Sequence, residues 1–395
     1  MFVKSTSHSV TFIAQGRGLL TVPMYPSATP SNLETQHMTF RFNSSRSRRL
    51  AVAGASVAVA ALALTACSSG SGSDASESPA GEEGFGDLTL QLSWILNEEF
   101  AGEYFADSKG YYEEAGFSSV NLVPGPSTGV AELVSGTADV ALSDSISVGA
   151  AVANEGAPLK IIGATFQANP FTILSLAEGG DIATVDDLKG KRIGVQDSNT
   201  TLFNALLAAN DIDPSELTIV PVQYDPAPLV NGEVDGFMAY ITNESVTVAA
   251  QGLDTTDLPF ADNGLPFVAE TITVTDEQIA DNREMLKAFL VAEIRGWTDA
   301  LNDPEEGSRL AVEEYGVDLD LNPENSLAGA IAQNELIVSD ETEEFGIFTI
   351  SDALQASTIG SLEGAGIMIE AGDLFDMSLL AEVYEENPDL IAYMG

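Results

Sequence analysis

The segment Tyr240-Ile241-Thr242-Asn243-Glu244 places an aromatic ring, an amide and a carboxylate within five positions. An aromatic face can stack on a flat ring, and a carboxylate accepts hydrogen bonds from N–H groups. We therefore predict that Tyr240, Asn243 and Glu244 contact a bound ligand. The alternative for Glu244 is a charge on a solvated surface turn, because acidic residues are abundant throughout this chain.

Other polar and aromatic side chains gather where predicted strands end and predicted helices begin. Open α/β sheets bind ligands at the carboxyl ends of their strands, and N–H groups and hydroxyls at a helix start can hold an acceptor atom. The alternatives are helix capping for the polar residues and core packing for the aromatic ones. The ligand contacts predicted on this basis are Trp94, Asn97, Ser127, Thr128, Ser143, Asp144, Phe166, Gln167, Ser198 and Thr200.

The first 66 residues show the pattern of a secretory leader. The apolar run 50–63 follows a cluster of arginines and is too short for a membrane span, which needs roughly 20 residues. It ends at Leu64-Thr65-Ala66-Cys67, which resembles the lipobox of bacterial lipoproteins, so Cys67 is predicted to carry a lipid anchor. A buried free cysteine is the alternative. We expect Met38 to be the true start, residues 67–86 to form the anchor and a flexible linker, and the protein to be extracytoplasmic and membrane-anchored.

Composition beyond this leader excludes several kinds of chemistry. Both histidines, His8 and His37, lie within the leader, and Cys67 is the only cysteine. The rest of the chain cannot form a Ser-His or Cys-His nucleophile pair, a Cys/His zinc site or a disulfide, and we expect no cofactor and no metal. Beyond residue 66 there are 59 acidic and 9 basic residues, a formal net charge of −50, which repels nucleic acid.

Strand patterns alternate with helix patterns beyond residue 87, which indicates an α/β protein with mostly parallel sheets flanked by helices. Two extended stretches, 171–175 and 268–274, are interpreted as crossover strands that form a hinge between two lobes. We expect lobe I over 88–172 and 270–395, and lobe II over 173–269. Beyond the second crossover, apolar residues spaced for one helix face include Trp297, which is predicted to be core. The strands predicted before the second crossover are 88–94, 120–124, 138–142, 159–166, 191–195, 217–222 and 235–240, with helices at 130–134 and 202–209.

Several segments in this order resemble one family, the periplasmic binding proteins for nitrate, sulfonates, riboflavin and thiamine pyrimidine precursors. They include Gly110-Tyr111-Tyr112-Glu113-Glu114-Ala115-Gly116, Gly136-Thr137-Ala138-Asp139-Val140 and Asp187-Leu188-Lys189-Gly190-Lys191-Arg192-Ile193-Gly194-Val195. The resemblance implies the two-lobed, type II periplasmic binding protein fold. Trp94 with Asn97, and Tyr240 with Asn243 and Glu244, look most like the pyrimidine-precursor branch. Ser245 stands where that pattern has proline, which departs from the family at this turn.

The resemblance implies the solute-binding subunit of an ABC importer, a monomer that closes its lobes on a small heteroaromatic nutrient such as a thiamine pyrimidine precursor. Its partners would be a membrane permease, the ATPase subunit that drives it, and the membrane through Cys67. Riboflavin is the nearest alternative ligand, and an anion such as a sulfonate or nitrate is a weaker one, because few basic residues remain. Two further hypotheses are a secreted hydrolase built on paired carboxylates and a non-transport lipoprotein. We expect no enzymatic activity.

Overall fold

The structure, a computed structural model, describes residues 84–394, so the predictions about the leader, Met38 and Cys67 lie outside the described residues. Within them, ten strands form two five-stranded mixed sheets. The strands are β1 (Gly86–Gln91), β2 (Phe117–Val123), β3 (Val140–Asp144), β4 (Leu159–Phe166), β5 (Phe171–Leu176), β6 (Arg192–Val195), β7 (Thr218–Pro221), β8 (Gly236–Tyr240), β9 (Thr255–Pro259) and β10 (Ala269–Thr275).

The first sheet has the strand order β2-β1-β3-β10-β4. Strand β1 pairs in parallel with β2 and β3, whereas β10 is antiparallel to both β3 and β4. Four strands therefore run in one direction, and β10 alone among the described strands of this sheet runs against them. The carboxyl ends of β1, β3 and β4 consequently meet at one edge, where an open α/β sheet places its ligand.

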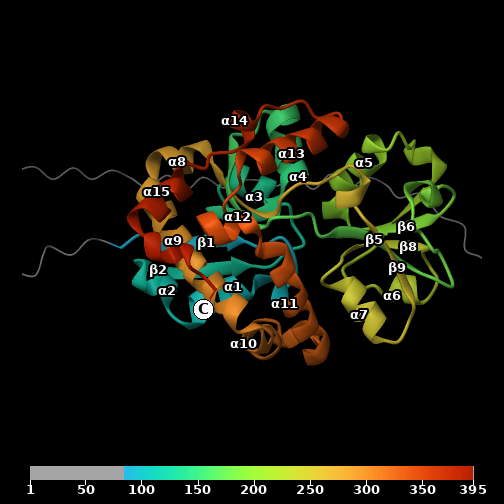
Figure 1. Cartoon of the computed structure of the whole chain (residues 1–395), viewed down its shortest axis with the longest axis horizontal. Helices are drawn as coiled ribbons and strands as arrows, with labels where there is room; N and C mark the ends of the chain where they lie inside the picture. The colour runs from blue at the N-terminus through green and yellow to red at the C-terminus, as the bar shows by residue number, and fades with distance from the viewer. Residues whose placement is uncertain (1–83, 395) are drawn as a thin grey trace, which may run out of the picture. The chain divides into compact units, whose positions relative to one another are not determined.

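The second sheet repeats this arrangement with the order β7-β6-β8-β5-β9. Strand β6 is parallel to β7 and β8, and β5 is antiparallel to β8 and β9. Strand β5 follows β4 of the first sheet, and β10 follows β9 of the second. The antiparallel strand of each sheet is thus the first strand after the chain crosses from the other sheet. Figure 1 shows β5, β6, β8 and β9 grouped with α5, α6 and α7.

Helices cover the two sheets and fill the C-terminal third of the described chain. The first seven are α1 (Ala101–Ser108), α2 (Tyr111–Glu114), α3 (Val130–Ser135), α4 (Ser145–Ala150), α5 (Thr200–Ala209), α6 (Ala227–Val230) and α7 (Glu244–Ala250). The others are α8 (Asp276–Asp281), α9 (Arg283–Asn302), α10 (Pro304–Leu310), α11 (Pro323–Ile337), α12 (Asp340–Phe345), α13 (Asp352–Gly364), α14 (Ala371–Leu374) and α15 (Ser378–Glu386). The single-turn 3₁₀ helices η1 (Glu98–Phe100) and η4 (Asp197–Asn199) lie just before α1 and α5. None of the helices between residues 84 and 394 has the length and apolar character needed to cross a membrane.

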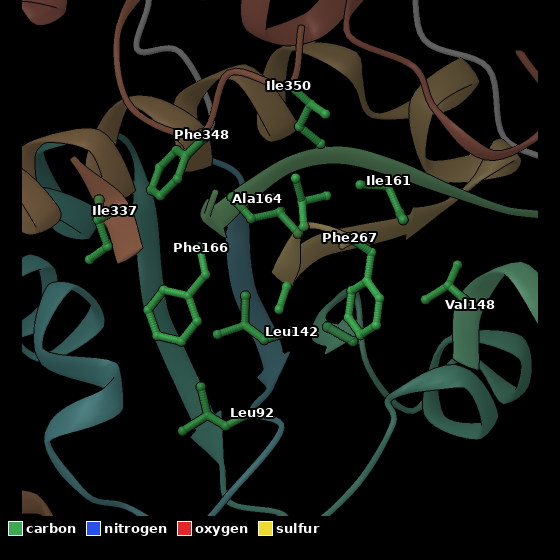
Figure 2. Packing of buried hydrophobic residues seen from close by; sticks show 14 of the residues in the cluster. Leu92, Leu142, Val148, Ile161, Ala164, Phe166, Phe267, Ile337, Phe348 and Ile350 are labelled. Carbon is green, nitrogen blue, oxygen red and sulfur yellow. The ribbon is translucent and has the colours of Figure 1, made fainter. Parts of the chain in front are cut away.

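The hydrophobic core of the first sheet joins its strands to helices from both ends of the described chain. Leu142 of β3 and Phe166 of β4 are almost fully buried. Figure 2 shows them beside Leu92, which follows β1, with Phe348 and Ile337 from the C-terminal third close by. A separate small cluster that includes Leu174, Phe237 and Val248 packs the second sheet against α7. Trp297 is 1% exposed in α9, which confirms the prediction that it is core.

Helices α1 and α9 approach closely because glycines face each other at their contact. A methyl group added at Gly296 would overlap the carbonyl oxygen of Gly102 and lie 2.9 Å from the Cβ atom of Ala106. We expect Gly296→Ala to lower the free energy of unfolding by about 2 kcal/mol, since overpacking against a backbone atom cannot be relieved by a rotamer change. Chemical denaturation measures this loss.

The matched control for this prediction is Gly360→Ala in the middle of α13. No heavy atom lies within 4 Å of a Cβ atom built at Gly360. Alanine there is expected to raise the free energy of unfolding by about 0.5–1 kcal/mol, because glycine inside a helix costs conformational entropy. Equal effects of the two substitutions would show that the α1–α9 contact tolerates a methyl group.

Candidate ligand-binding cavity

A cavity with an empty volume of about 460 Å³, its solvent-open part included, is lined by residues from both sheets. The lining combines aromatic rings, hydroxyl and amide groups and four carboxylates. The lining residues are Ser93, Trp94, Glu99, Ser127, Thr128, Ser143, Asp144, Phe171, Asn199, Met238, Ala239, Tyr240, Asn243, Glu244 and Glu270.

The aromatic part of the lining is held in place by edge-to-face contacts. Tyr240 ends β8, and its ring is perpendicular to that of Phe171 at a centroid distance of 4.5 Å. Phe166 packs against the same tyrosine at 6.4 Å. Such contacts add to the energy of burial. With Trp94, half-buried just beyond β1, the rings of Tyr240 and Phe171 offer apolar surfaces against which a flat ligand could pack.

Two of the carboxylates are fixed at the starts of helices. Asp144, the last residue of β3, caps α4, and its Oδ1 atom accepts a hydrogen bond from the Ser147 N–H at 2.8 Å. Glu244 is the first residue of α7 and folds back so that its Oε2 atom accepts the Tyr240 N–H at 2.9 Å. Ser245, in the position where the related pattern has proline, donates to Asp257 at 2.7 Å. The turn after β8 is therefore closed by side-chain hydrogen bonds.

Glu270 reaches the cavity because β10 contains a bulge. Ala269 pairs with Asp144 and Thr271 with Ser143, so Glu270 has no partner of its own on β3. Its φ of 46° lies in the left-handed region, which residues other than glycine, asparagine and aspartate rarely adopt. Bulges commonly re-aim one side chain next to a functional site, and here the side chain that lines the cavity is a glutamate.

Hydrogen bonds to the carboxylates connect the two sheets across the cavity. The Tyr240 hydroxyl at the end of β8 donates to Glu270 Oε1 at 2.9 Å. The amide of Asn243 donates to Glu99 Oε2 of η1 at 3.0 Å. The Ser93 hydroxyl lies 2.9 Å from Glu270 Oε2 and 3.3 Å from Glu99 Oε1. The carboxyl groups thus take part in the contacts between the segment carrying β8 and α7 and the first sheet.

Burial raises the pKa of every carboxyl group in this lining. It raises the pKa of Glu244 to about 7, and it also raises that of Asp144. The pKa of Glu270 rises to about 7, mainly by burial and against the hydrogen bonds that it accepts. The pKa of Glu99 lies well above its usual value because of burial first and the neighbouring charge of Glu270 second. Burial therefore favours the protonated forms of these groups, and Glu99 and Glu270 share a hydrogen bond.

Eight of the thirteen residues predicted to bind a ligand line this cavity: Trp94, Ser127, Thr128, Ser143, Asp144, Tyr240, Asn243 and Glu244. Phe166 and Gln167 are buried behind it, and Phe166 supports the Tyr240 ring. Ser198 and Thr200 lie outside it, whereas Asn199 between them lines it. Ser198 and Asn199 belong to the 3₁₀ turn η4, and Thr200 is the first residue of α5.

Asn97 lies beside a second cavity that shares Trp94, Asn243 and Glu244 with the first. Its side chain is 5% exposed, and its Oδ1 atom has no hydrogen-bond partner among the described residues. Glu98 lines the same space, and burial raises its pKa to about 7. Between residues 84 and 394 no group of acidic side chains is arranged to hold a metal ion.

Seven lining residues were not predicted from the sequence, among them Glu99, Glu270, Ser93 and Phe171. Glu99 follows another glutamate in an acidic chain, and nothing in the sequence distinguishes it from exposed acidic residues. In the structure it is only 2% exposed. The sequence places Glu270 only within a predicted extended stretch. The position of a bulge cannot be predicted from the pattern of apolar and polar residues along a strand. Phe171 begins a predicted crossover strand next to the cavity, and that position could have identified it.

Two mixed sheets with one opposed strand each and a cavity lined from both define the type II periplasmic binding protein fold. The structure is similar to the periplasmic nitrate-binding protein NrtA from Synechocystis PCC 6803, with a TM-score of 0.56 and 15% identity, over 77% of this chain and 90% of that one. Residues 97–307 match the NMT1/THI5 like family. The chain belongs to this family.

Two characterised sequences are similar to the chain. The riboflavin-binding protein RibY of Chloroflexus aurantiacus is 25% identical over 74% of this chain and 85% of its own length. The 4-amino-5-hydroxymethyl-2-methylpyrimidine phosphate synthase of Schizosaccharomyces pombe is 29% identical over 55% of this chain and 66% of its own length. The similar sequences thus include a protein named for binding and one named for catalysis.

Proposed function

We propose that this protein is the extracytoplasmic solute-binding subunit of an ABC importer and that it captures a small heteroaromatic nutrient, such as a thiamine pyrimidine precursor, by lobe closure. The observation that carries the proposal is the cavity lined from both sheets, with aromatic rings and carboxylates side by side. The hydrogen bonds from Tyr240 to Glu270 and from Asn243 to Glu99 are contacts that an opening motion would break.

The proposed lobes follow the two sheets. Lobe I comprises 88–172 and 270–395, lobe II comprises 173–269, and the hinge lies in the connections into β5 and β10. Hinges of this kind absorb a rotation in a few residues at the ends of elements. Closure would present the complex to a permease, which a cytoplasmic ATPase drives. The proposed anchor is a lipid on Cys67, and the receptor acts as a monomer.

A binding role agrees with the chemistry of the cavity better than catalysis does. The described chain contains neither histidine nor cysteine, and Glu99 and Glu270 share a hydrogen bond. Hydrogen-bonded carboxyl groups are closer than the approximately 5 Å that separates the carboxyl pair of a retaining glycosidase. Riboflavin is the alternative ligand, and the similarity to RibY favours it specifically.

A thermal-shift screen tests this proposal. Purified protein is heated with aminopyrimidines, riboflavin, taurine, alkanesulfonates and nitrate. A ligand at about 100 times its Kd adds about 2.7 kcal/mol of stability, and we expect this only for a pyrimidine or a flavin. Trp94→Ala and Glu244→Ala should each abolish the shift. A shift only with a sulfonate or nitrate would contradict the proposed ligand class, and the absence of any shift would contradict the receptor function.

A further inference from the structure

The carboxylates of the cavity have no cationic partner in the part of the chain that the structure describes. None of the fifteen lining residues is lysine or arginine, although four of them are acidic. The hydrogen-bond donors to these four are Ser93, the Tyr240 hydroxyl, Asn243, main-chain N–H groups and, for Glu270, the carboxyl group of Glu99. All of these donors are uncharged. Buried carboxylates are usually paired with a cation or coordinate a metal, so this site lacks one charge of the usual pair.

All nine basic residues beyond residue 66 are engaged elsewhere. Seven form ion pairs: Lys109 with Asp299, Lys189 with Asp186, Arg192 with Asp235, Arg283 with Glu382, Lys287 with Glu386, Arg295 with Glu114, and Arg309 with Glu306. Lys160 donates to the carbonyl groups of Gly372 and Asp373, and Lys191 to that of Gly180. None of these partners lines the cavity. Every described basic side chain therefore has a partner outside the cavity, and none neutralises the carboxylates of the lining.

The cavity also contains what a cationic ring requires besides charge. Trp94, Tyr240 and Phe171 present aromatic surfaces, and aromatic faces attract cations as well as flat rings. Glu270 is held in the lining at the left-handed backbone position described above. Strain of this kind persists where the surrounding structure enforces it, often at ligand-binding sites.

We infer that the cavity binds its ligand as a cation, a heteroaromatic ring that carries a positive charge and N–H donors, and that the ligand supplies the charge missing from this site. The inference rests on the proposed receptor function and specifies the class of its ligand. It separates this chain from receptors for nitrate and sulfonate, whose ligands are anions. An anion would enter a site with four acidic groups and no basic one.

Proton release accompanies such binding. The pKa values of Glu244 and Glu270 are about 7 through burial. The titratable groups that act on Glu270 are Glu99 from η1, Glu103 from α1, Tyr240 from β8 and Asp144 from β3. Glu98 and Glu99 act on Glu244. A cation favours the ionised carboxylates and so expels their protons. Affinity for a permanent cation should therefore rise with pH between about 6 and 8, by up to tenfold per pH unit for each proton released.

Calorimetric titration of the purified protein with matched probes tests this inference. The probes are 4-amino-5-hydroxymethyl-2-methylpyrimidine, its ring-N-methylated pyrimidinium and the 4-oxo analogue that lacks the amine. At pH 8 the pyrimidinium is expected to bind at least tenfold more tightly than the 4-oxo compound. Its affinity should fall at pH 6, and its apparent enthalpy should change with the ionisation enthalpy of the buffer.

The variants Glu244→Gln and Glu270→Gln should each weaken binding of the pyrimidinium and reduce the number of protons released on binding. Glu293→Gln is the matched control, since Glu293 is also a buried carboxyl group, with a pKa that burial raises to about 8, but lies outside the cavity lining. It should leave the release unchanged. Equal binding of the 4-oxo compound without proton exchange would overturn the cation inference and leave the receptor function standing. Binding of methanesulfonate or nitrate would overturn it as well. If spermidine binds and none of the heteroaromatic probes does, the result would support a cationic ligand and contradict a heteroaromatic one.

Discussion

Replacing Glu270 by glutamine is expected to abolish ligand binding and at the same time to stabilise the ligand-free protein. Glutamine keeps the shape of the side chain, and its carbonyl oxygen in the position of Oε1 can still accept hydrogen bonds from Ser93 and Tyr240. Its amide can donate to Glu99, which shares a hydrogen bond with Glu270 in the native protein. The buried negative charge is lost, and we expect affinity to fall by about 100-fold or more, because pairing with a buried charge is worth several kcal/mol.

The gain in stability has the same cause. Burial raises the pKa of Glu270 from 4.5 to about 7, and each pKa unit corresponds to about 1.4 kcal/mol. Ionising this group in the folded protein therefore costs on the order of 3 kcal/mol at pH 8, and Glu270→Gln removes that cost. Chemical denaturation at pH 8 measures the gain. The control is Glu363→Gln at an exposed position of α13, expected to change the free energy of unfolding by less than about 0.5 kcal/mol. A Glu270→Gln variant less stable than the native protein would contradict this account.

The ligand-free protein is expected to become more stable as the pH falls from 8 to 5.5. A carboxyl group whose folded-state pKa exceeds its unfolded value contributes stability that is fully present below the unfolded pKa and is lost as the pH rises through the folded pKa. Glu98, Glu244 and Glu270 have pKa values of about 7, and Glu293 of about 8, all through burial. The unfolded value is 4.5, so the loss falls between about pH 5 and 8.

We expect the free energy of unfolding to decrease by at least about 2 kcal/mol across this window, which is the contribution of one group whose folded-state pKa is about 7. Exposed acidic residues titrate near pH 4, so their mutual repulsion is nearly constant above pH 5.5 and does not produce the same trend. Denaturation at constant ionic strength measures the change. A stability that is flat or rising from pH 5.5 to 8 would contradict the burial of these groups.

A second pair of buried carboxyl groups lies outside the cavity lining and contributes to the pH dependence of stability without contacting the ligand. Glu103 of α1 and Glu293 of α9 lie in the same interior, and each is 2% exposed or less. The Tyr112 hydroxyl donates to Glu293, and the Trp297 indole N–H donates to Glu103 at 3.4 Å. Burial and the charge of Glu293 raise the pKa of Glu103 well above its usual value. The double variant Glu103→Gln/Glu293→Gln should make the pH curve shallower, whereas Glu98, Glu244 and Glu270 continue to titrate. It should change ligand affinity far less than Glu270→Gln does.

Many of the strands could be predicted from the sequence because short runs of apolar and β-branched residues mark strands that are buried on both faces. Strands β3, β4 and β10 are buried along almost their whole length. The stretch 159–166 was predicted with the bounds that β4 has, and 235–240 differs from β8 by one residue. Strand β9 (Thr255–Pro259) was missed, since its sequence is short and largely polar. The helices beyond α9 were not predicted, because their apolar residues lie on several faces and form no single periodic stripe. Helix α11 is an example, since its buried residues include serine, glycine and glutamine as well as alanine and isoleucine.

The candidate site was predictable wherever it depends on strand ends and not where it depends on local backbone irregularity. Tyr240, Asn243 and Glu244 converge because β8 ends at the cavity and the next turn leads into α7. Glu270 enters through a bulge at positive φ, and neither feature follows from residue type. Phe166 was placed correctly at a strand end, but strand position does not specify which face meets the cavity.

Intrinsic tryptophan fluorescence tests the central claim, that this cavity is the ligand site, most directly. The chain has two tryptophans: Trp94 lines the cavity, and Trp297 is buried in the core. Titration of an aminopyrimidinium or a flavin at pH 8 should produce a saturable change in emission. The change should disappear in Trp94→Phe, although calorimetry still detects binding there, and binding itself should be lost in Glu244→Gln. A change that persists in Trp94→Phe, or undiminished binding to Glu244→Gln, would show that the ligand binds elsewhere.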